Sequence, residues 1–375
     1  MLIAYYCTFI LQHFSIFVKQ SIIINMKRFD NMIIKKIVSL ISAFLLLLGV
    51  SQSTAKEIIV SSERELIFTE KPTEDCHAST VLPLENGNVV AAWFAGTKEK
   101  ADDVNILTCV RTENGWGAPV KVTADENTAH WNPVLFELPD GRIALYFKVG
   151  REIASWKTFV CYSEDGESWS EPQELVEGDT SGGRGPVKNK PITLSDGTIL
   201  APASDESGKT WSAFVDISHD GGKTWEKSAP VEAKLGVIDV PMIQPSLWQS
   251  QDGSVHMFTR TKVGKIYRSD SFDGGKTWSK AYPTRVGNNN SGLDLDTDEK
   301  GRIFLVCNPH SFIGIRTPLS LLVSTDDGKS FRRIMNLEYG FGEYSYPAIV
   351  VKGDTVHITY TYERDYIVYR QIKIK

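Results

Sequence analysis

Polar and ionisable residues recur at one position relative to a repeated glycine turn. Six short turns carry a glycine between two apolar, β-branched runs, as a tight hairpin requires: Gly87, Gly141, Gly197, Gly253, Gly301 and Gly353. Counting back nine or ten residues from each glycine gives His77, Asn132, Lys188, Gln244, Ser291 or Gly292, and Tyr344. Five of these six positions hold a side chain that can form hydrogen bonds or titrate, so the pattern predicts a polar pocket wherever the six segments converge.

The residue types around these positions suit a hydroxyl-rich sugar that carries a carboxylate. Amides bind hydroxyl groups, cationic side chains bind the acid, and we expect the faces of Trp93 and Trp131 to pack on the ring. The residues expected to converge are Asn132, Lys188, Asn189, Lys190, Gln244, Asn288, Asn290, Tyr344 and Tyr346. The alternative interpretation is that such residues only cap the starts of strands.

Several other chemistries lack their motifs in this sequence. It has no phosphate-binding loop, no dinucleotide glycine fingerprint, no His-x-x-x-His pair and no Cys-x-x-Cys pair. We therefore expect no metal and no cofactor. Residues 56–375 carry 36 basic and 45 acidic side chains, a net charge of -9, so nucleic-acid binding is not expected either.

A second repeat predicts the architecture that positions these residues. The pattern Ser-x-Asp-x-Gly-x-Thr-Trp occurs in full or modified form with its aromatic residue at 116, 169, 225, 278 and 331, in steps of 53, 56, 53 and 53 residues. This period is typical of propeller blades, and 320 residues divided by about 53 gives six. The sequence therefore predicts an all-β, six-bladed β-propeller in one domain over residues 57–375. We interpret the motif's Ser, Asp and Gly as turn-forming groups rather than catalytic ones.

The first 55 residues differ from the rest, with five basic residues and one acid. Lys35 and Lys36, the apolar run 37–50 and the small residues 53–55 predict a secretory signal peptide that is cleaved after Ala55. The alternative is a membrane anchor, but the 14-residue run is shorter than the about 20 residues that span a bilayer. We therefore expect a periplasmic or secreted protein with no membrane attachment after cleavage. An even number of blades and no long apolar edge give no reason to predict an oligomer, so we expect a monomer.

Four cysteines follow the predicted cleavage site: Cys76, Cys109, Cys161 and Cys307. Three lie in apolar, β-like runs, which favours buried core thiols. The even number in an exported chain also leaves a disulfide open.

The repeat resembles the Asp boxes of the sialidase (neuraminidase) superfamily, whose members are six-bladed propellers, and the resemblance covers all of residues 57–375. The segments Trp131-Asn-Pro133, 188–191, 288–292 and 342–347 are similar to those of a divergent sialidase-like branch. The resemblance implies an arginine triad for the substrate carboxylate, in which Arg260 and Arg316 match two members and His77 stands where the third arginine is expected.

Other site residues are implied by the same resemblance. Tyr344 matches the nucleophilic tyrosine, Gln244 stands in place of the glutamate that activates it, and Glu363 matches a glutamate that steadies an arginine. Asp102 or Asp103, with Glu99 as a further choice, matches the acid/base aspartate. Lys188, Asn189, Lys190, Asn132, Asn290 and Tyr346 complete the predicted substrate contacts.

Three functions remain open from the sequence. The first is an exported, sialidase-like glycoside hydrolase acting on a terminal acidic sugar of a glycan, nominally an exo-α-sialidase. The second is a lyase or unusual hydrolase on uronate-capped glycans such as rhamnosyl-glucuronate, which the His77 and Gln244 replacements favour because they remove a fixed charge and a base. The third is a propeller that binds glycans without catalysis.

Overall fold

The structure is a computed structural model that describes residues 58–181, 183–206 and 211–375. The chain divides into two units, Met1–Thr54 and Ala55–Lys375. The predicted signal peptide and its cleavage site lie outside the described residues. Within the described part of the chain, no helix has the length and apolar character needed to cross a membrane.

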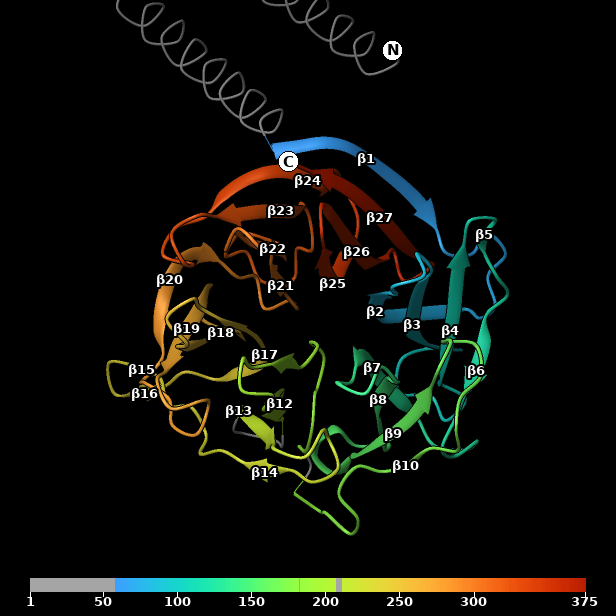
Figure 1. Ribbon diagram of the computed structural model, residues 1–375, viewed down its shortest axis with the longest axis horizontal. Helices are drawn as coiled ribbons and strands as arrows, with labels where there is room; N and C mark the ends of the chain where they lie inside the picture. Colours follow the sequence, from blue (N-terminus) through green and yellow to red (C-terminus); the bar gives the residue numbers. More distant parts are fainter. Residues whose placement is uncertain (1–57, 182, 207–210) are drawn as a thin grey trace, which may run out of the picture. The chain divides into compact units, whose positions relative to one another are not determined.

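Six antiparallel sheets stand around a central axis as the blades of a β-propeller, which confirms the predicted fold (Figure 1). Blade 1 contains β2 (Asp75–Pro83), β3 (Val89–Gly96), β4 (Asn105–Thr112), β5 (Gly115–Trp116) and β6 (Val120–Val122). Blade 2 contains β7 (His130–Glu137), β8 (Ile143–Val149), β9 (Lys157–Ser163) and β10 (Gln173–Glu174), with the 3-10 turn η1 (Ile153–Ser155) between β8 and β9. Blade 3 contains β11 (Ile192–Thr193), β12 (Ile199–Asp205), β13 (Ser212–Ser218) and β14 (Glu226–Lys227).

The remaining blades follow the same order, from the axis outward. A small hairpin of β15 (Lys234–Leu235) and β16 (Ile238–Asp239) leads into blade 4, which contains β17 (Met242–Gln249), β18 (Val255–Thr261), β19 (Lys265–Ser271) and β20 (Tyr282–Gly287). Blade 5 contains β21 (Asp294–Thr297), β22 (Ile303–Cys307), β23 (Leu319–Ser324) and β24 (Arg332–Glu338). Blade 6 contains β25 (Tyr344–Lys352), β26 (Thr355–Tyr362), β27 (Tyr366–Ile374) and β1 (Ile59–Leu66).

Blade 6 closes the ring by joining strands from the two ends of the propeller. β1 is its outermost strand and pairs antiparallel with β27, from Ile59 opposite Ile374 to Leu66 opposite Val368. Without β1, the strand β27 would present unpaired backbone N–H and C=O groups at the edge of blade 6. The pairing of β1 with β27 satisfies these groups and closes the ring.

The two sequence repeats lie at one face of the propeller. All six hairpin glycines have φ between 57° and 87°, a region that side chains disfavour. In the repeat motif of blade 3, Ser218 Oγ accepts the Gly222 N–H at 2.9 Å and Asp220 Oδ1 accepts the Thr224 N–H at 2.9 Å. The hydrogen bonds from the side chain and N–H of Thr224 hold the pKa of Asp220 far below its usual value. The motif is therefore a turn, as interpreted from the sequence.

The opposite face, where the inner strands begin, is called the funnel face below. In β2, β7, β17 and β25 the register with the next strand is interrupted by a bulge near this face. Each bulge contains a non-glycine residue in the left-handed region: Ala78 (φ 54°), Asn132 (43°), Gln244 (53°) and Tyr346 (51°). Such backbone costs about 1 to 3 kcal/mol per residue and is concentrated at functional sites, so the bulges indicate a functional site at the funnel face.

The core consists of apolar clusters between neighbouring blades. The four cysteines are buried and free, which confirms the prediction of core thiols. Trp93 and Trp131 are 0% and 2% exposed. Their rings belong to the core and do not offer a face to a ligand, which corrects the expectation from the sequence.

Candidate functional site

A cluster of side chains from four blades surrounds Tyr346 at the funnel face. Arg260, from the end of β18, donates from Nη1 to Tyr346 Oη at 2.8 Å and to Gln244 Oε1 at 3.1 Å. Its Nε donates to Asn290 Oδ1 at 3.1 Å. Three neutral side chains from blades 4, 5 and 6 thus fix the direction of one guanidinium group.

The Tyr346 ring is the centre of this cluster. The His77 ring lies against it with the centroids 4.2 Å apart. The guanidinium carbons of Arg260 and Arg316 each lie 5.7 Å from its centroid, and Lys188 Nζ lies 5.9 Å from it. The structure therefore brings five of the predicted site residues together, counting Gln244, around an aromatic ring surrounded by positive charge.

Tyr344 does not join this cluster, which is a correction to its assignment as the nucleophile. Its side chain is 5% exposed and packs in the core between blades 5 and 6. Its ring lies 5.1 Å from that of Tyr362, and its hydroxyl donates to the Phe341 carbonyl at 3.2 Å. Burial raises the pKa of Tyr344 to about 12. The bulge between Ser345 and Ala348 redirects the chain, so Tyr346 takes the position beside the arginines.

A third arginine, which sequence reasoning missed, completes the positive group. Arg364 lies in the turn between β26 and β27, where Glu363 and Arg364 both have left-handed φ of 56° and 59°. Its carbonyl accepts the Cys76 N–H at 2.9 Å, so it lies beside His77 on blade 1. The sequence signal that could have identified Arg364 is its position at a hairpin end, next to Glu363, the glutamate matched by the family resemblance.

Carboxylates hold Arg316 and Arg364 in place. Glu343 Oε1 lies 2.7 Å from Arg316 Nη1 and 3.2 Å from Arg364 Nε. Arg364 Nη1 also pairs with Glu99 Oε2 at 2.7 Å. Glu343 and Glu99 are therefore the arginine partners, a role that the sequence predicted for Glu363. Glu363 Oε2 instead accepts the Glu343 N–H at 3.3 Å.

His77 is an uncharged imidazole inside this positive cluster. It is 2% exposed, and its Nδ1 is buried without a hydrogen-bond partner. Burial, followed by the charges of Arg364, Arg316, Arg260 and Lys188, lowers the pKa of His77 well below its usual value. The residue in the place of a triad arginine therefore adds no positive charge at neutral pH.

Glu206 is a second residue that sequence reasoning missed. It follows β12 on blade 3, is partly buried, and accepts the Ser204 hydroxyl at 3.1 Å. Burial raises the pKa of Glu206, while the charge of Arg260 and a hydrogen bond with Gln244 lower it. The site thus contains a carboxyl group near Gln244, although position 244 itself has none.

Trp211 provides an aromatic face at the same site. The residue is partly buried, and its ring lies 3.5 Å from Lys262 Nζ and 5.6 Å from the guanidinium carbon of Arg260. An aromatic ring beside two cations is suited to packing against a sugar ring.

Lys188, Asn189 and Lys190 connect blades across the central channel. Lys188 Nζ donates to Asn189 Oδ1 at 2.8 Å and to the carbonyls of Leu293 and Pro347. Burial lowers the pKa of Lys188 to about 8. The amide of Asn189 donates to the carbonyls of Gln244 and Pro245 at 3.1 and 3.0 Å. These contacts hold inner strands together instead of aiming the polar groups at a ligand, which corrects their assignment as substrate contacts.

Lys190 makes equivalent contacts deeper in the channel. Its Nζ donates to the carbonyls of Leu295 and Ile349 at 2.8 and 2.7 Å and lies 3.4 Å from Asp294 Oδ2. A pocket of about 320 Å³ beyond it is lined by residues from the inner strands of all six blades. Lys190 therefore belongs to the channel and not to the cluster around Tyr346.

The predicted acid/base aspartates are exposed and already paired. Asp102 Oδ1 lies 2.8 Å from Arg151 Nε, and Asp103 Oδ2 accepts the Thr97 N–H at 3.0 Å. Asn132 lies in the bulge of β7 and is 6% exposed. In the described part of the chain, none of these three side chains makes a hydrogen bond, ion pair or ring contact with Tyr346.

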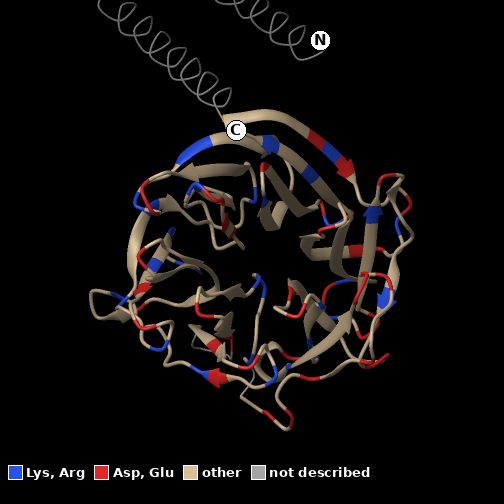
Figure 2. Ribbon diagram, in the orientation of Figure 1, with Lys and Arg blue, Asp and Glu red and all other residues tan. Residues whose placement is uncertain are grey.

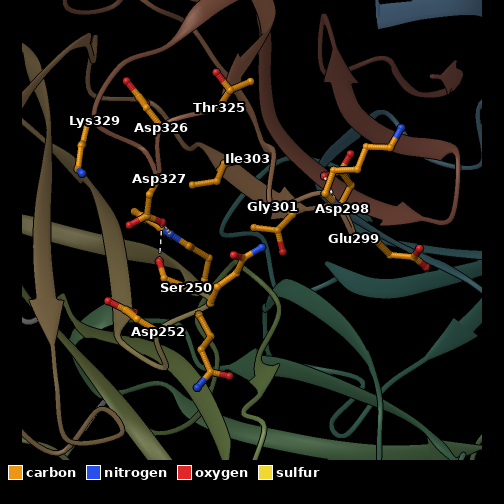
Figure 3. Close-up of a pocket in the computed structure, with 15 residues that line it drawn as sticks. Ser250, Asp252, Asp298, Glu299, Gly301, Ile303, Thr325, Asp326, Asp327 and Lys329 are labelled. Atoms are coloured by element: carbon orange, nitrogen blue, oxygen red, sulfur yellow. Dashed lines mark hydrogen bonds between the residues drawn. The ribbon is translucent and has the colours of Figure 1, made fainter.

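The charged residues and the pocket described next do not indicate a second candidate functional site. Figure 2 shows residues of both signs distributed around the ring. A pocket of about 570 Å³ lies between the turns of blades 4 and 5, and the Ser250 hydroxyl donates to Asp327 at its wall (Figure 3). Several acids line this pocket, but among the described residues no group of three or more His, Cys, Asp or Glu side chains is arranged to hold a metal ion.

A known protein is similar to part of this chain. The "Sialidase" of Paraclostridium sordellii is 29% identical over 150 residues, which are 35% of this chain and 34% of the relative. The match therefore spans about a third of that protein.

Solved structures share the fold at low sequence identity. The Hadza microbial sialidase Hz136 has a TM-score of 0.68 at 16% identity, over 80% of this chain and 66% of that one. A protein of unknown function from Dyadobacter fermentans has a TM-score of 0.69 at 18% identity, over 84% of this chain and all of that one. Trypanosoma rangeli sialidase, in complex with the inhibitor DANA, has a TM-score of 0.64 at 15% identity, over 84% and 60%. Because the sequence model of the BNR repeat-like domain matches residues 87–358, this propeller belongs to the BNR repeat-like domain family and has the sialidase fold.

Proposed function

We propose that this protein is a glycoside hydrolase that removes a terminal acidic sugar from a glycan, nominally as an exo-α-sialidase. The observation that carries the proposal is the hydrogen bond from Arg260 to the hydroxyl of Tyr346 inside a group of three arginines. Guanidinium groups match a sugar carboxylate in shape and charge. Sialidases are among the proteins with this fold, which supports the choice of substrate class.

Tyr346 is the proposed nucleophile. A tyrosine attacks poorly at its free pKa of about 10, so its phenolate needs stabilisation. The Arg260 N–H supplies this, because it donates to the oxygen that becomes negative when the proton leaves. In the first step the Tyr346 proton passes to water, and the phenolate oxygen bonds to the anomeric carbon while the bond to the leaving oxygen breaks. In the second step water attacks the same carbon, the bond to Tyr346 breaks, and the free sugar acid is released.

Protonation of the leaving oxygen requires an acid. Glu206 suits this role because burial raises its pKa, so it keeps its proton to a higher pH than an exposed glutamate. Asp102 and Asp103 remain alternatives from the family resemblance.

The proposal is tested by incubating the purified protein with a panel of sialosides and uronate-capped oligosaccharides and identifying products by mass spectrometry. Release of the free sugar acid, lost in Tyr346→Phe and retained in Tyr344→Phe, is the expected result. Binding of the same glycans without any product would contradict the hydrolase and leave a glycan-binding propeller.

A lyase acting on uronate-capped glycans is the second candidate, and His77 favours it. A neutral imidazole with a free Nδ1 beside a tyrosine is suited to move the proton next to a carboxylate, with Arg260 stabilising the resulting enolate. A product with ultraviolet absorbance from a new C=C bond, absent in His77→Ala, would select this reaction over hydrolysis.

Export and a monomeric state are also part of the proposal. They are supported by the predicted signal peptide and by ring closure within a single chain. Mass spectrometry of the protein from the periplasm or medium should give Lys56 as the first residue. Light scattering should give the mass of one chain.

A further inference from the structure

Glu343 places a carboxylate of the protein itself between two arginines of the site. Its Oε1 accepts from Arg316 Nη1 at 2.7 Å, from Arg364 Nε at 3.2 Å and from the Ser345 hydroxyl at 3.2 Å. One carboxylate oxygen therefore receives three donors, two from different loops and one from β25. A substrate carboxylate would seek the same two guanidinium groups.

The backbone around Glu343 holds this carboxylate in position. Glu363 Oε2 accepts the Glu343 N–H at 3.3 Å, and the Glu343 carbonyl accepts the Glu363 N–H at 2.9 Å. At Gly342 a Cβ atom would lie 2.1 Å from Glu363 Oε1 and 2.6 Å from Tyr344 Oη. Only glycine fits at position 342. The close approach of the backbone at this position allows Glu343 to lie next to Arg316 and Arg364.

The three arginines are consequently in different states. Arg260 has the neutral partners Gln244, Asn290 and Tyr346, whereas Arg316 is paired with Glu343 and Arg364 with both Glu343 and Glu99. The side chains of Arg316 and Glu343 are 22% and 35% exposed, so solvent and ligands reach this pair. An incoming carboxylate meets one unneutralised guanidinium and two that are already occupied.

We propose that Glu343 is a specificity-determining residue that competes with the substrate carboxylate for Arg316 and Arg364. The inference rests on the proposed function, in which the site takes a terminal sugar acid. Glu343 weakens binding of the acid relative to an uncharged analogue of the same sugar. Its removal takes the carboxylate partner from Arg316, leaves Arg364 paired with Glu99 alone of the two glutamates, and makes the site more selective for acids.

The test compares binding of free N-acetylneuraminic acid and glucuronic acid with binding of their methyl esters, by isothermal titration calorimetry. The esters keep the ring and hydroxyl groups but lack the charge. For Glu343→Gln we expect about tenfold or tighter binding of at least one acid, since a charge-assisted hydrogen bond is worth about 1.5 to 3 kcal/mol. The affinity for its ester should stay within about twofold, a change of well under 1 kcal/mol.

Two further variants keep the test decisive. Glu65→Gln is the matched control, because it removes a carboxylate that lies 2.7 Å from Arg111 at the outer strand β1, and it should change no sugar affinity. Glu343→Ala should also bind the acid more tightly, which covers the case in which the glutamine variant folds poorly. Melting temperatures establish that each variant is folded.

Equal or weaker binding of the acids by both Glu343 variants would overturn the inference and make Glu343 a residue that orients the arginines for substrate. Failure of the proposed function is distinguished by the product assay. In that case the wild-type protein releases no sugar acid in the glycan panel, whatever the effect of the Glu343 variants on binding.

Discussion

Arg260 Nη1 donates a hydrogen bond of 2.8 Å to the hydroxyl oxygen of Tyr346. The two residues come from β18 and β25, on blades that blade 5 separates. The bond therefore exists only in the closed ring, and it identifies which tyrosine of the segment 344–346 has the environment of a nucleophile.

Replacing Tyr346 by phenylalanine removes the proposed attacking oxygen. We expect kcat for glycoside cleavage to fall by about 100-fold or more, with a smaller change in KM. Tyr344→Phe is the matched control. It should keep kcat within a few-fold while losing about 1 kcal/mol of stability with its hydrogen bond to the Phe341 carbonyl. Equal loss of activity in both variants would contradict the assignment.

Gln244→Glu places a carboxylate where the family resemblance expects one. Gln244 Nε2 lies 3.5 Å from Tyr346 Oη, so a carboxylate there is close enough to take the phenol proton. We expect the rate of sialoside hydrolysis at neutral pH to rise by about tenfold. Asn290→Asp, which also adds a carboxylate next to Arg260, should not raise it. A lower rate in Gln244→Glu would show that the amide is needed to hold Arg260 or Glu206.

Lys190→Met should destabilise the propeller without acting at the funnel face. Lys190 Nζ lies 3.4 Å from Asp294 and 3.8 Å from Asp296, and burial already raises the pKa of Asp296. Removing the cation leaves these acids unpaired near the axis, at a cost of about 3 to 5 kcal/mol. Urea unfolding measures this loss. Lys234→Met, at an exposed pair of 4.0 Å with Asp239, is the control and should cost well under 1 kcal/mol.

The buried Lys188 should make stability depend on pH in the alkaline range. Burial lowers its pKa from 10.5 to about 8, so between these values the unfolded chain binds a proton that the folded chain does not. Stability therefore rises with pH across that window. Between pH 8 and 10.5 the free energy of unfolding should increase by a larger amount in the wild-type protein than in Lys188→Met. Parallel curves would contradict the lowered pKa.

His77 should also make the free energy of unfolding increase with pH, in this case in the acidic range. Its pKa lies well below 6.5 in the folded protein, so the unfolded state gains a proton first as the pH falls through 6.5. Stability is thus lost on acidification, and His77→Phe should lose less of it than the wild-type protein. His219→Asn, at an exposed position, is the control. A histidine NMR titration gives the pKa of His77 directly, and a value near 6.5 would refute the burial argument.

The sequence by itself determined the architecture, because its signals are local. A hairpin glycine and a turn motif each specify their own few residues, and their spacing repeated over the chain is enough to define six blades. It also predicted that Gln244 and Tyr346 stand near the axis, since equivalent positions in a closed ring converge, whereas Arg260 and Arg316 were assigned from the family resemblance.

Only the tertiary structure decided how these residues are used. A bulge at residues 345–348 redirected the chain, so that Tyr346 rather than Tyr344 meets Arg260. Arg364 comes from the turn between β26 and β27 on blade 6, and Glu206 follows β12 on blade 3. Their place in the site depends on contacts between segments far apart in the sequence. Lys188 and Lys190 have the residue type of ligand-binding cations, but in the folded ring the nearest acceptors are backbone carbonyls of neighbouring blades. A side chain's type is local, whereas its partners are set by the packing of the ring.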